Sequence, residues 1–445
     1  MTGRRQIHLG LFILGTGSHV AGWRYPGAFG SFQDIASIQA IASCAERGKF
    51  DMIFMGDNLY ADPAAHPSYT VRLEPLTMLS AIAAATSRIG LGATTSTTYG
   101  DPFSTARAFA SLDHISAGRA AWNAVTTANT VSGANFGRAH PDHGQRYAIA
   151  EEFIDVVRGL WDCWDDDAIV ADRSSGLYID PERVHALDHV GPFFAVKGPL
   201  NIGRAPQGRP VILQAGGSGP GQRLAARTAD VVFSVVQDFT EAQAQYKTFK
   251  ALLPEFGRRA EDVTLLPGVM PVVGRTAREA FDKLKVLQSF VSETNALSLL
   301  SDRFGMDMAG YDLDGPVPDI ALPDSYHSFV GVMLAKARRE SMTLRDVYNL
   351  MAAARGHWVL CGSAEHIADT LQHWFENGAA DGFNIMPPYF PEGFDDFVDL
   401  VVPILQERGL FRTDYTGATL RDHLGLDRPA PLRVDRGQTD TTALS

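Results

Sequence analysis

The sequence predicts an α/β fold in which eight parallel strands and their helices close into a (β/α)₈ TIM barrel with insertions. Short apolar runs alternate with segments whose apolar residues recur at helical spacing, and eight strand-like runs lie between residues 7 and 386. Strands separated by helices form parallel sheets, because a parallel pair needs a crossover connection. Polar side chains also follow the first four runs directly, and the carboxyl ends of barrel strands carry the functional site.

The first part of the chain supplies four pairs of strand and helix. The strand at 7–14 is an apolar run stopped by Gly15 and Gly17, and a helix at 32–47 follows it. The other three pairs are 52–55 with 75–86, 89–94 with 103–115, and 120–125 with 149–161.

Alternation resumes after residue 210 and supplies the other four strands. The predicted pairs are 211–214 with 221–229, 231–235 with 240–253, and 263–273 with 277–291. Helices at 330–338 and 344–354 follow. The final unit comprises a helix at 364–377, a strand at 382–386 and a helix at 394–408.

Two stretches break this pattern, so we expect insertions at about 164–210 and 291–355 within a single barrel domain that spans 1–426. The first stretch is rich in Asp, Gly and Pro, and we expect a hairpin near 191–196 within it. In the second stretch, the composition of 302–325 is typical of a loop. The tail at 427–445 contains two prolines and a polar run, and we expect it to be extended.

Composition favours a soluble enzyme of small molecules. The chain has 445 residues, 45% of them hydrophobic, and no apolar run approaches the roughly 18 residues of a membrane span. A net charge of −12 opposes binding to nucleic acid or anionic membranes. The three cysteines lack the spacing of a zinc site, and the first residues lack a secretion signal, so we expect a cytoplasmic protein.

The polar residues at the strand ends have two interpretations. Ser, Thr, Asn and Asp are preferred helix caps, so any one group alone is explained as a cap. Four groups in succession favour a site instead. The groups are Ser18 and His19; Asp57, Asn58 and Tyr60; Thr94 to Thr97; and Asn123 with Thr126.

A glycine-rich turn at 214–223 (QAGGSGPGQR) joins the fifth strand to its helix. Such a turn presents backbone N–H groups at a helix N-terminus, which favours a phosphate, and Ser218 adds a hydroxyl. The turn is neither a Walker A loop nor a Gly-x-Gly-x-x-Gly fingerprint. On spacing alone, a plain tight turn explains it equally well.

The segment 140–147 (HPDHGQRY) enters the fourth helix. His143 and Tyr147 are four residues apart, so they share one face if the helix has begun. Metal binding by His140 and His143 is the alternative, but no further ligand lies at suitable spacing, and we predict no metal site.

Several of these segments together resemble the flavin-dependent monooxygenases of the bacterial luciferase-like superfamily. The resemblance extends from about residue 7 to 426, and it is closer to the branch of nitrilotriacetate monooxygenase component A and dibenzothiophene sulfone monooxygenase. The motifs are 50–57 (FDMIFMGD), 94–97 (TTST), 112–119 (LDHISAGR) with 122–126 (WNAVT), 143–147 (HGQRY), 214–218 (QAGGS), 381–384 (DGFN), and 408–421 with its Tyr415.

The resemblance implies that FMN binds at the C-terminal face of the barrel. The positions that match the family's flavin contacts are Asp57, Thr94, Asn123, His143, Tyr147 and Ser218. Ser218 would hold the phosphate, while Asn123 and Thr94 would lie nearer the ring. His19, His143 and Tyr60 match positions near the reactive edge of the flavin, and the two histidines are the candidate hydrogen-bond donors or proton relays.

The resemblance also implies a reaction and its partners. Members of this branch take reduced FMN from a separate NAD(P)H-dependent flavin reductase, and the flavin reacts with O₂ to give a C4a-hydroperoxide that oxygenates a small organic substrate. A homo-oligomer, dimer or tetramer, is expected. Two alternatives stay open: a deazaflavin (F420)-dependent oxidoreductase of the same fold, which needs no O₂, and a flavin-binding protein without catalysis.

Overall fold

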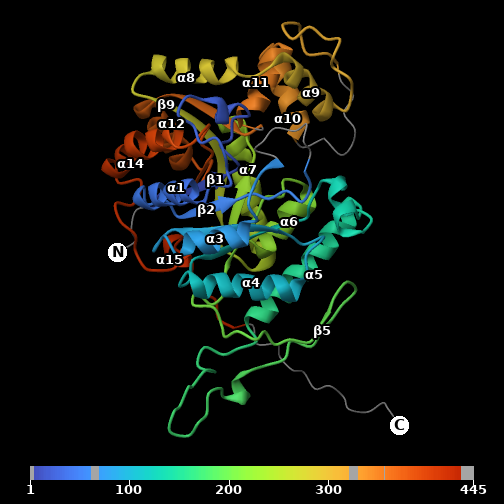
Figure 1. Cartoon of the computed structure of the whole chain (residues 1–445), viewed down its shortest axis with the longest axis vertical. Coiled ribbons are helices and arrows are strands. Elements are labelled where there is room, and N and C mark those ends of the chain that lie inside the picture. The colour runs from blue at the N-terminus through green and yellow to red at the C-terminus, as the bar shows by residue number, and fades with distance from the viewer. Residues whose placement is uncertain (1–4, 62–69, 320–328, 355, 432–445) are drawn as a thin grey trace.

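The computed structural model describes residues 5–61, 70–319, 329–354 and 356–431, and its centre is a closed parallel barrel (Figure 1). Eight strands pair in the order β9, β11, β1, β2, β3, β4, β7 and β8, and β8 pairs back to β9. The predicted (β/α)₈ barrel is confirmed. Its strands are β1 (His8–Ile13), β2 (Met52–Met55), β3 (Gly90–Ser96), β4 (Ala120–Val125), β7 (Val211–Gln214), β8 (Val231–Ser234), β9 (Thr264–Gly274) and β11 (Gly382–Ile385).

Helices surround the barrel and run antiparallel to its strands. None in the described residues is long and apolar enough to cross a membrane. The outer helices are α1 (Ile35–Arg47), α3 (Pro75–Ala83), α4 (Pro102–Ile115), α5 (His143–Trp161), α6 (Gly219–Thr228), α7 (Phe239–Leu252), α8 (Ala277–Ser289) and α12 (Ala364–Glu376), followed by α13 (Glu392–Asp396), a π-helical turn (Phe397–Val401) and α14 (Val402–Glu407).

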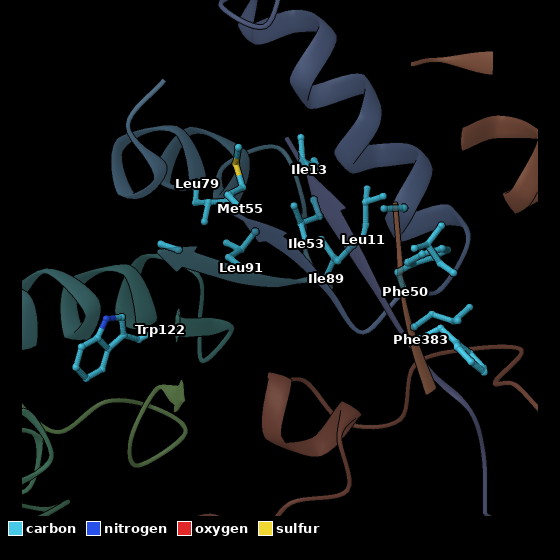
Figure 2. Close-up of a cluster of buried hydrophobic side chains, with 14 of the residues drawn as sticks. Leu11, Ile13, Phe50, Ile53, Met55, Leu79, Ile89, Leu91, Trp122 and Phe383 are labelled. Carbon is cyan, nitrogen blue, oxygen red and sulfur yellow. The ribbon is translucent and has the colours of Figure 1, made fainter. Parts of the chain in front are cut away.

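Alternation along each strand divides the core into two layers. Leu11 and Ile13 of β1 point outward and join the cluster between strands and helices, which Figure 2 shows around α1. Phe12 and Leu14 of the same chain segment point into the barrel and join a separate interior cluster. Because side chains alternate with a period of two, one set of side chains on each strand packs against the surrounding helices, and the other set fills the interior of the barrel.

Side-chain caps fix where the outer helices begin. Asp34, Asp101, Asp142 and Asp238 each accept a backbone N–H in the first turn of the helix that follows. Such a cap satisfies an N–H group that has no partner within the helix. The N-terminal turns that face the strand ends are therefore held at defined positions.

The chain between α5 and β7 leaves the barrel as a narrow ribbon. Isolated bridges pair Trp164 with Val184 and Ile169 with Ile179, and the short strands β5 (His189–Val190) and β6 (Ala195–Val196) form an antiparallel hairpin. The hairpin expected near 191–196 is confirmed. The Asp165 to Asp167 run forms ion pairs with His185, Arg204 and Arg183 in turn.

The segment after α8 contains more secondary structure than the sequence predicted. Helix α9 (Glu293–Phe304) was not predicted, and its last three residues fall in the expected loop at 302–325. Helices α10 (Phe329–Arg339) and α11 (Leu344–Ala354) match the prediction and share an apolar cluster with α9. Strand β10 (Trp358–Ser363) was also missed; it pairs with the end of β9 that extends beyond the barrel.

The C-terminal segment closes the amino-terminal end of the barrel. The carboxylate of Asp51, at the start of β2, is completely buried and contacts the guanidinium of Arg412 and the ring of His8 at 3.0 Å. Burial alone would raise the pKa of Asp51, but Arg412 and His8 outweigh it and hold that pKa below its usual value. Helix α15 (Leu420–His423) packs beside this pair, and its buried His423 has a pKa lowered by burial to about 4.

Candidate functional site

A cavity of about 950 Å³ opens at the carboxyl ends of the strands. Its walls come from the ends of β1 to β4, β7 and β8 and from the first turn of α5. The volume lies at the upper end of the range of ligand pockets, and the position is the one at which barrels bind substrates and cofactors.

The cavity brings together the six residues that match the family's flavin contacts, whereas two of the three candidate catalytic residues lie outside its described lining. Its lining includes Asp57, Thr94, Asn123, His143, Tyr147 and Ser218. His19 and Tyr60 do not belong to the lining. Tyr60 is half-buried. Residues 62–69, which come soon after it in the sequence, lie outside the described residues.

Asn123 on β4 lines the cavity and has one polar atom without a partner among the described residues. Its Nδ2 donates to Thr94 Oγ1 at 2.9 Å, and that hydroxyl donates to the carbonyl of Met55 at 2.6 Å. The Thr94 hydroxyl must therefore accept from Asn123, which fixes the orientation of the amide. Asn123 Oδ1 is left buried without a partner among the described residues, as an acceptor for an N–H group.

Two hydrogen-bond donors are also buried without a partner among the described residues. Gln214, the last residue of β7, is buried and its Nε2 has no partner among the described residues. Arg146 on α5 donates from Nη1 to the carbonyl of Thr127 at 3.1 Å, while its buried Nε has no partner within the same part of the chain. Among the described residues no carboxylate lies within ion-pair distance of Arg146, which lines the cavity and contributes a positive charge to its wall.

The glycine-rich turn forms a cradle beside the cavity. Ser218 caps α6, since its Oγ accepts from the N–H of Gly221 at 3.3 Å and donates to the Tyr147 hydroxyl at 3.2 Å. A Cβ atom at Gly221 would lie only 2.8 Å from that hydroxyl, so glycine is needed for the approach. Ser218 and Tyr147 thus meet at a helix N-terminus, where the helix dipole favours an anion.

Helix α5 begins at His143, as the predicted pairing with Tyr147 requires. Asp142 caps the helix by accepting the N–H of Gln145 at 2.8 Å. The rings of His143 and Tyr147 are 4.9 Å apart, so the two side chains share one face of the helix.

The opposite wall carries an acid. Asp57 follows β2, and burial raises the pKa of its carboxyl above the usual value, with the N–H of Asn58 and the charge of Arg72 opposing the rise. A carboxyl of this kind accepts hydrogen bonds when ionised and donates one when protonated.

His19 differs from the sequence expectation of a group that titrates near neutral pH. It is completely buried, and burial lowers its pKa to about 3, so the ring is neutral at pH 7. Its Nδ1 accepts the N–H of Ala21 at 3.0 Å, which places the ring proton on Nε2. Nε2 has no partner among the described residues, so this ring can donate a hydrogen bond but does not carry a positive charge.

The floor of the cavity was missed by the sequence reasoning. Phe12, Phe54 and Phe233 line it, with ring centroids 5.0 to 5.6 Å apart. The sequence did contain a signal for these residues, because inward-pointing positions near the carboxyl end of a barrel strand face the functional site.

No described group of three or more His, Cys, Asp or Glu side chains is arranged to bind a metal ion. His140, the second candidate ligand, instead holds the Tyr99 hydroxyl at 2.7 Å from its Nδ1.

The fold and the site define a (β/α)₈ enzyme with a large cavity at its strand ends, whose wall combines polar side chains with an aromatic floor. Comparison with known proteins defines the class further, because residues 9–381 match the luciferase-like monooxygenase family. The chain belongs to this family, whose members are flavin-dependent monooxygenases.

Individual relatives align over almost the whole chain. N-acetyl-S-(2-succino)cysteine monooxygenase of Bacillus subtilis (strain 168) is 46% identical, with 96% of this chain and 98% of the relative covered. Nitrilotriacetate monooxygenase component A of Aminobacter aminovorans is 45% identical with the same coverage. The solved structure of EDTA monooxygenase from Chelativorans sp. BNC1 superposes with a TM-score of 0.83 at 31% identity, covering 95% of this chain and 99% of that one.

Proposed function

We propose that this chain is the oxygenase component of a two-component monooxygenase, which binds reduced FMN and uses O₂ to oxygenate a small organic substrate. The observation that carries the proposal is the cavity wall with three buried polar atoms that lack partners among the described residues: Asn123 Oδ1, Gln214 Nε2 and Arg146 Nε. Buried polar atoms are almost always paired, so such a set points to a polar ligand.

The residues fit a flavin mononucleotide. The isoalloxazine ring offers N–H groups for Asn123 Oδ1 and carbonyl groups for the Gln214 amide. The phosphate fits the N-terminus of α6, where Ser218 and Tyr147 meet, and Arg146 supplies the positive charge that balances an anionic cofactor. Asp57, Thr94 and His143 supply further polar wall around the same space.

When bound, reduced FMN supplies the electrons that activate O₂, so that one oxygen atom enters the substrate and the other leaves as water. The chain's own residues hold the ring, exclude water and supply protons. The Phe12, Phe54 and Phe233 floor keeps water from the buried side of the cavity. We propose His143 and His19 as hydrogen-bond donors or proton relays, with Tyr60 as a third catalytic residue near the reactive edge of the flavin. His143 lines the cavity, whereas His19 and Tyr60 lie outside its described lining, and His19 would act through a neutral Nε2–H.

The substrate class proposed is a small organic molecule with a sulfur or nitrogen atom, or an apolar one. The names of similar proteins support this range, since they act on a succinylated cysteine, nitrilotriacetate and an aromatic sulfone. The aromatic floor adds an apolar contact surface.

We further propose that a separate NAD(P)H-dependent flavin reductase provides the reduced FMN, that the chain works as a homo-oligomer, and that it acts in the cytoplasm. The first point is supported by relatives named as one component or one subunit of a system.

The test combines the purified chain with a general flavin reductase, NADH, FMN and O₂ labelled with heavy oxygen. A panel of thioethers, tertiary amines, aryl sulfones and alkanes is added, and products are analysed by mass spectrometry. One labelled oxygen atom per product, dependent on this chain and on FMN, is the expected result. Turnover only with a reduced deazaflavin and without O₂, or flavin binding without any product across the panel, would contradict the proposal.

A further inference from the structure

The backbone turns sharply at Thr127, the second residue after β4. Its φ angle of 44° lies in the left-handed region, where the Cβ atom of an L residue comes too close to the following carbonyl oxygen. Six described residues other than glycine have a positive φ, and Thr127 is the only one of the six that is β-branched and that lines the cavity. Strained residues persist where their surroundings hold them, and they gather at functional sites.

Hydrogen bonds from the end of β3 hold this turn. The hydroxyl groups of Thr127 and Ser96 share a hydrogen bond of 2.7 Å. The hydroxyl of Thr98 donates to the carbonyl of Thr126 at 2.8 Å. Ser96 is itself fixed, because its Oγ accepts the backbone N–H groups of Thr98 and Tyr99 at 3.2 and 3.1 Å. The conformation of Thr127 is therefore imposed by the neighbouring strand end and not by its own preference.

The turn brings two successive carbonyl groups onto one nitrogen atom. Arg146 Nη1 donates to the carbonyl of Thr127 at 3.1 Å and to that of Thr126 at 3.4 Å. In an extended strand, successive carbonyl groups point in opposite directions, so both could not reach the same donor. The positive φ of Thr127 removes that alternation. These two carbonyls are the only acceptors that the guanidinium finds among the described residues, so they determine where its charge lies.

The guanidinium lies where a small displacement matters. Arg146 is buried and lines the cavity, and the next residue on α5, Tyr147, is hydrogen-bonded to Ser218 at the N-terminus of α6. A charge-assisted hydrogen bond needs a distance of about 2.7 to 2.9 Å and good alignment. The strength with which the cavity binds an anion therefore depends on the position of this cation as well as on its presence.

We propose that Thr127 is a positioning residue, whose left-handed backbone holds Arg146 at the cavity wall so that the guanidinium can bind an anionic group of the ligand. Because FMN supplies that anion, this inference rests on the proposed function. Thr127 acts through its backbone, and its hydroxyl group serves to hold the turn against Ser96. The alternative is a direct contact between the Thr127 hydroxyl and the ligand.

Two substitutions remove the same hydroxyl group but differ in backbone preference. Thr127→Val stays β-branched and disfavours a positive φ, whereas Thr127→Gly adopts it readily. Anaerobic titration with reduced FMN is expected to show at least about tenfold weaker binding to Thr127→Val, the scale of one charge-assisted hydrogen bond. Thr127→Gly is expected to stay within about threefold of wild type, because its backbone keeps the turn.

Equal weakening in both variants would indicate a direct hydroxyl contact and would overturn the inference, as would unchanged affinity in Thr127→Val. Circular dichroism checks that each variant is folded. Should Thr127→Val fail to fold, Thr127→Ala takes its place, since its Cβ atom also disfavours a positive φ. The expected order of affinity is then glycine above alanine.

Arg146→Gln tests whether Thr127 acts through the guanidinium. Arg146→Gln alone is expected to weaken FMN binding, and adding Thr127→Val to it is expected to cost no more than about a further twofold. A further loss as large as that of Thr127→Val in the wild-type background would show independent action and would overturn the inference.

Ser341→Val is the matched control for strain and for the loss of a hydroxyl group. Ser341 has a φ of 51° but lies between α10 and α11, outside the described cavity lining. Its substitution is expected to leave FMN affinity unchanged. Weakening as large as that of Thr127→Val would mean that strain at any site has this effect, and the inference would fail.

Arginine modification of the ligand-free chain provides a readout that does not need FMN. Phenylglyoxal reacts with accessible guanidinium groups, and mass spectrometry measures the rate at each arginine. Arg146 is expected to react at least about threefold faster in Thr127→Val than in wild type or Thr127→Gly, because the two carbonyls no longer hold it. Arg278 on α8, whose side chain is 92% exposed, is expected to react equally in all three chains.

The two measurements separate the two proposals. A wild-type chain that binds no reduced FMN would contradict the proposed function, and the modification rates would then decide on the role of Thr127 alone. Equal rates at Arg146 in wild type and Thr127→Val would overturn that role, whether or not FMN binds.

Discussion

Asn123, which lines the cavity, donates its amide to the hydroxyl of Thr94 at 2.9 Å and so leaves its carbonyl oxygen free to accept a hydrogen bond. Neighbouring strands β4 and β3 carry the two residues in register, which makes the orientation a property of the barrel. The free acceptor is therefore in place before any ligand arrives, and a preorganised group of this kind costs little reorganisation on binding.

Replacing Asn123 by alanine is expected to weaken binding of reduced FMN by about 1 to 3 kcal/mol, the cost of losing a hydrogen bond to a buried partner. Anaerobic titration followed by flavin fluorescence measures the change. Asn377→Ala is the control, because Asn377 donates its amide to the carbonyl of His373 at the end of α12, and neither residue belongs to the cavity lining. Equal losses in both variants would mean that the effect is general loosening.

Ser218→Ala is expected to weaken FMN binding, by about 1 to 3 kcal/mol, more than riboflavin binding. The two ligands differ only in the phosphate, so the difference isolates the contact at the N-terminus of α6. The substitution also removes a helix cap, and Ser363→Ala removes the corresponding cap of α12 as a control. The same loss for riboflavin would place the phosphate elsewhere.

The pH dependence of stability follows from two buried histidines. Burial lowers the pKa of His19 to about 3 and that of His423 to about 4, whereas an unfolded histidine titrates near 6.5. Protonation therefore favours the unfolded chain: the contribution is fully present above about pH 6.5 and is lost as the pH falls below it. Each residue accounts for about 1.4 kcal/mol of the free energy of unfolding lost between about pH 7.5 and 5.5.

Urea unfolding of His19→Gln and His423→Gln at the two pH values checks this expectation. Each substitution should shrink the difference between the two pH values, and the exposed His366→Gln should leave it unchanged. A difference as large as that of wild type in both variants would show that these rings are not buried in the neutral form.

Arg412→Gln is expected to destabilise the chain by about 3 to 5 kcal/mol, because it leaves the fully buried carboxylate of Asp51 without its cation. Thermal unfolding measures the loss. The control is Arg345→Gln, which breaks pairs with Asp314 and Glu293 at the surface and should change the melting temperature little. Similar shifts in the two variants would contradict a special role for the buried pair.

The barrel could be predicted from sequence because apolar residues recur with a different period in its strands than in its helices. The elements that were missed, α9 and β10, lack such a clear pattern of apolar residues. The predicted helix at 277–291 was followed by Ser292, Glu293 and Thr294, which resemble a break, yet α9 begins there because α10 and α11 cover its apolar side. Strand β10 has a polar end and pairs only with the projecting part of β9, and such tertiary context overrides local propensity.

The site likewise contains residues that the sequence could identify and residues that it could not. Asn123, Ser218 and their neighbours could be placed at the cavity from sequence, because four successive strands end in polar groups and a glycine-rich turn follows the fifth. Gln214 and Arg146 could not be identified in this way, because what distinguishes each of them is one buried polar atom without a partner among the described residues, which only packing reveals. The neutral state of His19 likewise depends on its complete burial.

The central claim is that the cavity holds reduced FMN, and anaerobic calorimetric titration of the wild-type chain with reduced FMN tests it most directly. The account predicts one saturable site per chain, with affinity reduced by both Asn123→Ala and Ser218→Ala but by neither Asn377→Ala nor Ser363→Ala. No saturable binding, or affinity unchanged in both cavity variants, would contradict it.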